Sequence, residues 1–311
     1  MNEEIRRAAR ILRAGGLVAF PTETVYGLGA DASSAAAVAK LYAAKRRPAE
    51  HPVIVHFDEA SRAFEWAREV PEAARLVAQR YWPGPLTLVL RRSSLAQDFV
   101  TGGQDSIGLR VPSHRVAQAL LREFGAGVAA PSANMFSRPS ATSAAHVRQD
   151  LAAHAALVLD GGASEIGIES TILDFSSGRP VLLRPGHISA PELETLLGRR
   201  IEAKGESAPR HSGGLERHYA PRTPSRLVPT HALDAEIARH GEKVAVLAFS
   251  RPDERVDFWI RMPREPAGYA KRLYAALREL DSAGCETILI EQPPQGSEWD
   301  AVLDRLQRAT G

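Results

Sequence analysis

The sequence predicts an α/β protein made of two domains joined by a polar linker. Short apolar stretches alternate with amphipathic stretches of helical spacing in residues 1–200, and they do so again in residues 226–311. This alternation is typical of domains in which helices cover a sheet. Between the two, residues 202–224 are rich in Gly, Pro, Ser and His without hydrophobic periodicity, as in a linker. We therefore place a first domain at 1–200, a linker at 201–225 and a second domain at 226–311.

The elements of the first domain follow from the spacing of apolar residues. A helix is expected at residues 5–13, because apolar residues recur on one face from Ile5 to Leu12 and two glycines follow. Other runs of helical spacing predict helices, and short apolar runs beside Pro or Gly predict strands. The further expected helices are 35–45, 71–81 and 115–124, and the expected strands are 17–20, 52–57, 86–90, 107–111, 128–130, 157–160 and 171–175.

The second domain is expected to be a small Rossmann-like unit. Its expected strands are 244–249 and 288–291, and its expected helices are 268–283 and 299–309. It contains no G-x-G-x-x-G loop, so nothing in it indicates a nucleotide site. The sequence leaves three roles open for this domain: it could hold the linker, form a dimer contact or dock a partner protein.

Composition excludes several classes of protein. The 311 residues carry a net charge of only +2, which is too small to indicate nucleic-acid binding by itself. Cys285 is the only cysteine, which excludes an internal disulfide and a multi-cysteine zinc site, and no H-x-x-x-H or H-E-x-x-H spacing predicts a metal site. No stretch approaches the ~20 apolar residues that span a bilayer, and no secretory signal is evident, so we expect a cytoplasmic protein without membrane contact.

Polar clusters follow three of the expected elements. PTETVYGLG, at residues 21–29, places hydrogen-bonding side chains after a strand, and its glycines allow a ligand to approach closely, although a plain turn also uses Pro and Gly. KRRP, at residues 45–48, either complements a helix dipole or clamps a polyphosphate. In PSAN, at residues 131–134, Ser132 and Asn134 would point to the same side if the segment is extended.

Charged residues at strand ends have more than one interpretation. Arg110 closes a strand and Arg184 precedes Pro-Gly, so each either faces solvent, caps carbonyl groups or binds an anion. The Glu169–Ser170 pair before another strand is equally open. Since the sequence has neither a Walker A loop nor a G-x-S-x-G elbow, the residues alone predict an α/β enzyme with a basic, hydroxyl-rich site for an anionic ligand.

The motifs taken together resemble the YrdC-like threonylcarbamoyl-AMP synthases in their long two-domain form. PTETVYGLG, KRRP with HPVIVH, SIGLRVPSH, PSAN, GIESTILDF, LLRPG and HYAP occur in that family's order over residues 21–221, and the tail LYAALRELDSAG…TILIEQPP looks like the extra C-terminal domain. The resemblance implies a YrdC-like twisted α/β catalytic domain, a linker that folds over the active site, and a small Rossmann-like C-terminal α/β domain.

The activity that the resemblance implies is that of a nucleotidyltransferase. L-Threonine and bicarbonate form a carbamate that attacks the α-phosphorus of ATP, which gives threonylcarbamoyl-AMP and pyrophosphate. Mg²⁺ accompanies the ATP, and no organic cofactor is needed. The product passes to a tRNA threonylcarbamoyltransferase complex that modifies the adenosine next to the anticodon.

The resemblance also implies roles for individual residues. Those matching the threonine site are Thr24, His56, Arg110, Ser132 and Ser170. Those matching the ATP site are Arg47, His51, Ser106, Asn134, Thr142, Arg184 and Tyr219. Lys45 and Arg47 are expected to stabilise charge on the departing pyrophosphate, and no general base is obvious. The sequence departs from the family pattern at His51, where Asn is usual, and at residues 135–137, where Met-Phe-Ser replaces x-Ser-Gly.

Two other functions remain as alternatives. A carbamoyltransferase that uses carbamoyl phosphate has a related domain, but it adds zinc-binding cysteines that this chain lacks. A double-stranded RNA or tRNA-binding module without catalysis would use arginines such as Arg6, Arg7 and Arg10. The small net charge disfavours that module, and weak tRNA binding is kept only as a secondary activity.

Overall fold

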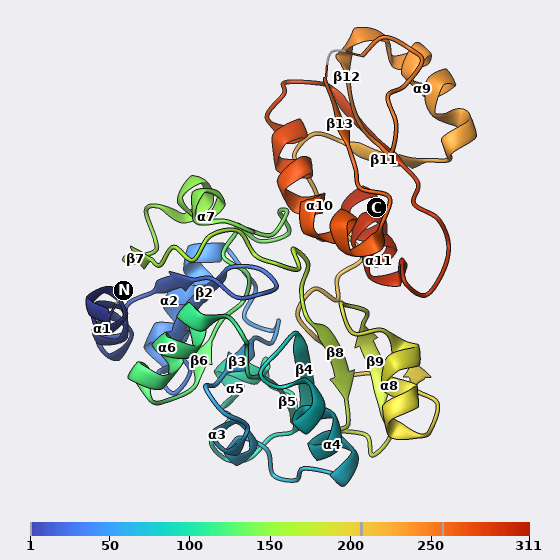
Figure 1. The fold of residues 1–311 in the computed structure, drawn as a ribbon. Helices are drawn as coiled ribbons and strands as arrows, with labels where there is room; N and C mark the ends of the chain where they lie inside the picture. The colour runs from blue at the N-terminus through green and yellow to red at the C-terminus, as the bar shows by residue number, and fades with distance from the viewer. Residues whose placement is uncertain (1, 206–207, 257) are drawn as a thin grey trace.

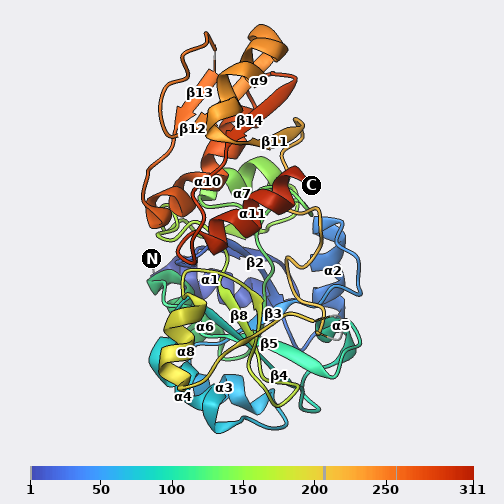
Figure 2. The same ribbon diagram turned by 90° about the vertical axis from the view of Figure 1, so that its right-hand side faces the viewer.

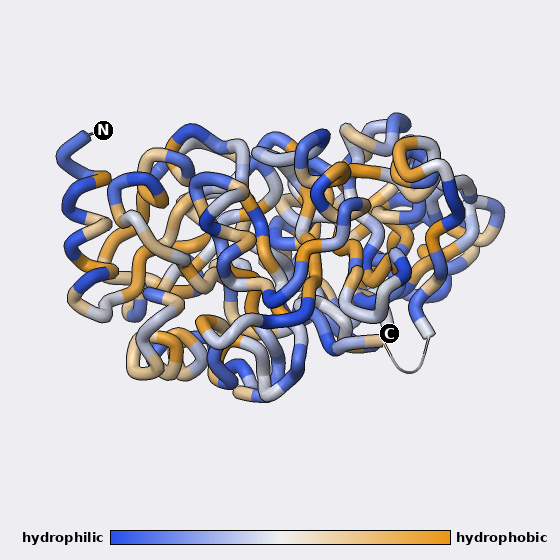
Figure 3. Tube along the Cα trace, turned by 90° about the horizontal axis from the view of Figure 1, so that it is seen from below, coloured by the Kyte–Doolittle hydropathy of each residue, from blue (hydrophilic) through white to orange (hydrophobic). Residues whose placement is uncertain are grey.

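The residues described by the computed structural model, 2–205, 208–256 and 258–311, form one ten-stranded and one four-stranded sheet. Figure 1 shows each sheet in its own unit, the N-terminal unit below and the C-terminal unit above. Both units combine strands with helices, so the predicted α/β class is confirmed. In Figure 3 the hydrophobic stretches lie largely inside the units and the hydrophilic ones largely at the rim.

The first sheet mixes parallel and antiparallel neighbours. Its strands, in spatial order, are β10 (Glu202–Ala203), β9 (Val181–Arg184), β8 (Thr171–Asp174), β4 (Leu86–Arg91), β5 (Ser106–Arg110), β3 (Ile54–His56), β6 (Val128–Ala129), β2 (Gly27–Asp31), β1 (Val18–Phe20) and β7 (Leu157–Val158). The central pairs β4–β8 and β3–β5 are parallel, whereas β4 and β5 are antiparallel.

Helices cover both faces of this sheet, because successive strand residues point to opposite sides. Val18 and Phe20 of β1 pack with α1 and α6, whereas Ala19 belongs to the cluster that contains α2. The helices of the unit are α1 (Asn2–Arg13), α2 (Ala35–Lys45), α3 (Ala60–Glu65), α4 (Glu72–Tyr81), α5 (Asp98–Thr101), α6 (Arg115–Phe124), α7 (Ala144–Leu151) and α8 (Ala190–Leu197).

The second sheet is wholly parallel, in the order β11-β14-β12-β13. Its strands are β11 (Ser225–Val228), β12 (Val244–Ala248), β13 (Phe258–Arg261) and β14 (Thr287–Glu291), and its helices are α9 (Leu233–His240), α10 (Pro266–Asp281) and α11 (Asp300–Thr310), with 3₁₀ turns at Thr230–Ala232 and Gly241–Lys243. Alternation places Val246 against α9, and Leu247 against α10 and α11. The helices therefore flank the sheet on both sides.

Helices α10 and α11 lie between the second sheet and the first unit, as Figures 1 and 2 both show. Val25 and Ile168 of the first unit share a buried apolar cluster with Leu273 of α10 and Leu306 of α11. Ion pairs add to this contact: Asp150 with Arg278 at 2.6 Å, and Arg138 with Asp281 at 2.7 Å. The C-terminal unit is thus packed against the loops of the first unit.

Residues 27–31 correct the interpretation of the first polar cluster. They form strand β2 rather than part of a loop after the first strand. A Cβ atom on Gly29 would lie 2.8 Å from Val128 Cγ1 and 2.9 Å from Phe20 Cε1. This glycine is therefore required by the packing of neighbouring strands, not by the approach of a ligand.

The contact between the two units can be tested at Gly167, where the backbone lies against α10. Gly167 and Gly178 have nearly the same left-handed conformation, with φ of +84° and +86°. A Cβ on Gly167 would lie 2.5 Å from Lys271 Cα in α10, whereas one on Gly178 would meet no atom of the described chain within 4 Å.

We expect Gly178→Ala to cost about 1 kcal/mol of unfolding free energy, from backbone strain alone. Gly167→Ala should cost about 1–3 kcal/mol more, because it also pushes α10 away. Urea unfolding of both variants measures the difference. Equal losses would show that this loop does not press on α10.

Candidate active site

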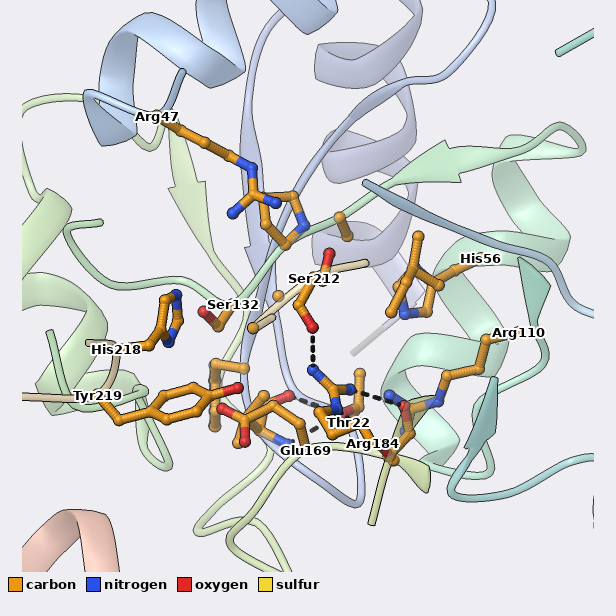
Figure 4. A pocket seen from close by; sticks show the side chains of 18 residues that line it. Thr22, Arg47, His56, Arg110, Ser132, Glu169, Arg184, Ser212, His218 and Tyr219 are labelled. Carbon is orange, nitrogen blue, oxygen red and sulfur yellow. Dashed lines mark hydrogen bonds between the residues drawn. The ribbon is translucent and has the colours of Figure 1, made fainter. Parts of the chain in front are cut away.

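A cavity lies in the first unit where strand ends, neighbouring loops and the linker meet (Figure 4). Figure 2 shows the amber linker passing in front of the first sheet between α8 and β11. The residues that line the cavity are Thr22, Val25, Tyr26, Gly27, Arg47, Ile54, His56, Arg110, Ala130, Pro131, Ser132, Glu169, Ser170, Arg184, Ser212, Gly213, His218 and Tyr219. This set combines basic, hydroxyl and aromatic groups.

Three guanidinium groups give the cavity its charge. Arg47, Arg110 and Arg184 line it, yet they are only 8%, 4% and 3% exposed. Arg110 pairs with Glu23 at 2.5 Å, and Arg184 Nη1 donates to the carbonyl of Ser212 at 2.8 Å. Burying cations is costly unless a charge partner is present. Arg47 and Arg184 form no ion pair within the described residues, so the cavity suits an anionic ligand.

Unpartnered polar atoms point to the same conclusion. Within the described chain, Arg47 Nε, His56 Nδ1, His218 Nδ1 and the Tyr219 hydroxyl are buried without a hydrogen-bond partner, and all four residues line the cavity. Buried polar groups in proteins nearly always have partners. We infer that a polar ligand provides the partners of these atoms.

The cavity's histidines are neutral near neutral pH. Burial, followed by the charge of Arg110, lowers the pKa of His56 to about 3. Burial is also the largest cause that lowers the pKa of His218 to about 3. Burial raises the pKa of Tyr219 to about 12, so its hydroxyl stays protonated. The positive charge of the site therefore comes from arginines, whereas these three side chains offer neutral hydrogen bonds.

A serine/threonine turn shapes the loop after β1. Thr22 Oγ1 donates to the Val25 carbonyl at 2.6 Å and accepts from the Val25 amide at 3.2 Å. Thr24 lies behind it, fully buried, with its hydroxyl 2.9 Å from that of Thr22. The structure thus places Thr22, rather than the predicted Thr24, on the cavity wall.

Lys45 supports the site from outside the cavity. Its Nζ donates to the carbonyls of Ser132 (2.6 Å) and Asn134, and its side chain is buried. Asn134 donates to the carbonyls of Met135 (2.7 Å) and Arg138 (2.9 Å). Ser132 lines the cavity, whereas Asn134 and Lys45 hold its loop, and Asn134 Oδ1 is buried without a hydrogen-bond partner within the described residues.

The cavity unites many of the predicted site residues and leaves others outside. Those that line it are Arg47, His56, Arg110, Ser132, Ser170, Arg184 and Tyr219. Ser106 lines an adjoining hollow that shares Ile54 and Ser212 with the cavity. His51 lines another hollow, and Thr142 Oγ1 lies 3.3 Å from His146 Nδ1.

Phe136 and Ser137 lie in the segment 135–137, where the sequence departs from the family pattern. The ring centre of Phe136 lies 5.6 Å from the rings of His51, 5.9 Å from His218, and 5.6 Å from the guanidinium carbon of Arg47. The neighbouring Ser137 has a φ of +61°, a conformation that favours the glycine usual there. Phe136 thus packs beside Arg47 and His51, two residues predicted to surround ATP, and beside His218.

Sequence reasoning missed the linker residues Ser212, Gly213 and His218. A Cβ on Gly213 would lie 2.1 Å from the Tyr219 hydroxyl and 3.1 Å from Arg184 Nη1, so only glycine fits. The available signal was the run HSGG shortly before HYAP. Because this run lacks hydrophobic periodicity, it was predicted to belong to a linker and not to the site. Residues 206 and 207 of the predicted linker lie outside the described residues.

Two further properties concern the described residues only. None of their helices combines the length and apolar character needed to cross a bilayer. Within these same residues, His, Cys, Asp and Glu side chains form no group of three or more that could hold a metal ion.

Comparison with known proteins agrees with this geometry. Residues 10–186 match the Sua5/YciO/YrdC family model described as "Telomere recombination", and residues 188–311 match "Threonylcarbamoyl-AMP synthase, C-terminal domain". The threonylcarbamoyl-AMP synthase of Pyrococcus abyssi is 38% identical, over 99% of this chain and 94% of the relative. The crystal structure of P. abyssi Sua5 complexed with L-threonine superposes with a TM-score of 0.93 at 37% identity, covering 100% of this chain and 95% of that one.

A shorter relative shows which part of the chain varies. The threonylcarbamoyl-AMP synthase of Halorhodospira halophila is 38% identical over 174 residues, which are 56% of this chain and 91% of that protein. That protein is therefore too short to contain a counterpart of the C-terminal unit.

The lowered histidine pKa values predict how stability depends on pH. His218 binds a proton at about pH 3 when folded and at about pH 6.5 in its ordinary state, so the unfolded chain holds more protons between these values. Stability should therefore fall as the pH is lowered through this window, by up to about 1.4 kcal/mol per pH unit for each such histidine.

We expect His218→Gln to flatten this dependence, as measured by urea unfolding at several pH values. The exposed His154, replaced in the same way, serves as the control. An unchanged slope in His218→Gln would contradict the neutral, buried state of His218.

Proposed function

The chain belongs to the threonylcarbamoyl-AMP synthase family, and we propose that its cavity joins L-threonine, bicarbonate and ATP into threonylcarbamoyl-AMP and pyrophosphate. The observation that carries the proposal is the set of buried, unpartnered donors around a cavity lined by three arginines. A carboxylate, a carbamate and a triphosphate are the anions that such donors bind.

The amino-acid end of the site is proposed at Arg110. Its guanidinium is oriented by Glu23 and lies beside His56, on the other side of the cavity from Arg47 in Figure 4. An arginine fork suits the threonine carboxylate. The hydroxyls of Ser132 and Ser170, which line the same cavity, are proposed to bind the amine or the carbamate.

The nucleotide end is proposed between Arg47, Arg184 and the adjoining hollow. That hollow offers the apolar side chains of Val89 and Ile172 to a base and the hydroxyl of Ser106 to a polar group. The triphosphate would then extend past Ser212, which lines both the hollow and the cavity, and would reach Arg47 and Arg184.

The carbamate first forms from the threonine ammonium and bicarbonate with release of water and a proton, and the adenylyl transfer that follows needs no proton from the protein. A carbamate oxygen forms the new bond to the α-phosphorus while the bond to pyrophosphate breaks, and negative charge moves onto the leaving group. Arg47 and Arg184 stabilise that charge, and the remaining acceleration comes from in-line placement of the two reactants. Lys45 holds the Ser132 loop through two of its three N–H donors, and its predicted charge stabilisation of pyrophosphate is kept as part of the proposal.

Mg²⁺ is proposed to arrive with ATP and to neutralise phosphate charge. Magnesium commonly binds phosphate oxygens and water with one or two carboxylates, without a cage of protein ligands. Arginine side chains do not ligate metal ions, so in this arginine-rich cavity the nucleotide would supply most of the Mg²⁺ ligands.

The linker is proposed to act as a lid. His218 and Tyr219 enclose the cavity, and Tyr219 adopts a φ of +63°, a strained conformation for a non-glycine residue. Closure by this segment would exclude water, which would otherwise compete with the carbamate.

The product is proposed to pass to a tRNA threonylcarbamoyltransferase complex in the cytoplasm, and any direct contact of the protein with tRNA is proposed to be weak.

The main test is pyrophosphate release from ATP by the purified full-length chain. We expect release that requires L-threonine, bicarbonate and Mg²⁺ together, and that stops when EDTA is added. Release that is indifferent to threonine, or activity with carbamoyl phosphate instead, would overturn the proposal.

Arg47 and its neighbour Arg46 provide a matched pair of variants. Arg47 is buried in the cavity wall, whereas Arg46 is exposed at the end of α2. We expect Arg47→Gln to lower kcat/KM for ATP by about 10²-fold or more, because a charge that stabilises the transition state is lost. Arg46→Gln should leave kcat/KM unchanged. Equal effects in the steady-state assay would remove Arg47 from the phosphate site.

A further inference from the structure

Glu169 is a carboxylate on the cavity wall that is held by residues of both units. Its Oε1 accepts a hydrogen bond from Ser140 of the first unit. Its Oε2 accepts from the Tyr274 hydroxyl of α10 at 2.9 Å and from Arg305 Nε of α11 at 2.9 Å. The C-terminal unit therefore reaches the wall of the active site through this carboxylate.

Arg305 connects three segments of the site without lining the cavity itself. Its side chain is fully buried, and its Nη1 donates to the Pro185 carbonyl at 3.0 Å. Its guanidinium carbon lies 5.6 Å from the centre of the Tyr219 ring, within the range of a cation–π contact. Arg305 thus touches the segment before β8, the loop after β9 and the linker.

A buried ion pair of this kind is a poor device for stability alone. Removing two charges from water costs about as much as their attraction returns, so well-packed apolar residues often serve equally well. Its directional contacts, in contrast, fix the orientation of both partners. The short H. halophila relative also shows that a protein with this family name can be too short to hold α11.

We propose that Arg305 is a positioning residue for the reaction: from outside the cavity it orients Glu169 on the wall and seats Tyr219 of the linker, so that the C-terminal unit completes the closed site. This inference rests on the proposed function. It assigns the C-terminal unit a role in assembling the nucleotide site, because the Tyr219 hydroxyl and Arg184 both lie against Gly213 there.

The charge of Glu169 depends on the same contacts. Burial alone would raise the pKa of Glu169, but the charges of Arg305 and Arg184 and the hydrogen bonds from Ser140 and Arg305 outweigh it and hold the pKa below its ordinary value. The titratable and charged groups that face this carboxylate are Arg305 on α11, Tyr274 on α10, Arg184 on β9, and His218 and Tyr219 in the linker. Asp304 on α11 pairs with Arg305 at 2.6 Å. Without Arg305, Glu169 should take up a proton at higher pH.

The test compares four variants of the full-length chain. Arg305→Met removes the charge at similar length, and Arg305→Lys keeps the charge without the fork. Tyr274→Phe removes one hydrogen bond to Glu169 and keeps the ring, so it stays informative if Arg305→Met does not fold. Arg272→Gln is the control, because Arg272 is an exposed residue of α10 that pairs with Glu279 at 3.0 Å.

We expect Arg305→Met to raise the KM for ATP and to lower kcat/KM by about tenfold or more, whereas Tyr274→Phe has a smaller effect in the same direction. The acid limb of the kcat/KM profile should move to higher pH in Arg305→Met and return toward the wild-type position in Arg305→Lys. Arg272→Gln should match the wild type in both measurements.

The outcomes separate the two proposals. Wild-type protein without threonine-dependent pyrophosphate release would overturn the proposed function and, with it, the role of Arg305 in that reaction. An active wild type whose Tyr274→Phe and folded Arg305 variants keep the ATP KM and the pH profile of Arg272→Gln would overturn the positioning role alone.

Discussion

The buried ion pair between Glu169 and Arg305 is the contact on which the arrangement of the site depends. It is the place where the first unit, the linker and the last helix meet around one carboxylate. Loss of either partner would leave the other with only part of its compensating charge, since Arg305 also pairs with Asp304 at 2.6 Å and Glu169 also faces Arg184. The position of Tyr219 beside the cavity therefore follows from the packing of α11, which lies far from it in sequence.

A second constraint is the balance of charge within the cavity. Arg47, Arg110 and Arg184 are buried there, while Glu23 and Glu169 supply the facing carboxylates. Since both histidines on the wall are neutral, the three arginines exceed the two carboxylates by one charge, and this excess favours an anionic ligand. A carbamate and a triphosphate fit this requirement, because they bring negative charge to the ends of the cavity where the arginines lie.

The sequence predicted the fold class and the long, strongly periodic elements, because core burial requires that periodicity. It missed short elements such as α5 and β10, whose few residues carry too little pattern. In the site, strand-end residues such as Arg110 and Ser132 could be anticipated, because the ends of strands expose side chains to one space. The contacts of Lys45 with the carbonyls of Ser132 and Asn134 could not be predicted, since a cation before a turn has the same sequence pattern whatever acceptor it meets.

The linker shows why composition alone can mislead about order. Its polar, glycine-rich sequence lacks the apolar spacing of a helix or strand, yet His211, His218 and Tyr219 are buried. His218 and Tyr219 line the polar cavity, and Tyr219 joins the apolar cluster of α10 and α11 as a single residue, so no hydrophobic period along the linker is needed to hold them. Gly213 is small because the Tyr219 hydroxyl and Arg184 occupy the space where a side chain would stand. A segment that covers a charged site must itself be polar. For this reason the linker, although some of its residues are buried in the wall of the cavity, has the amino-acid composition of a flexible linker.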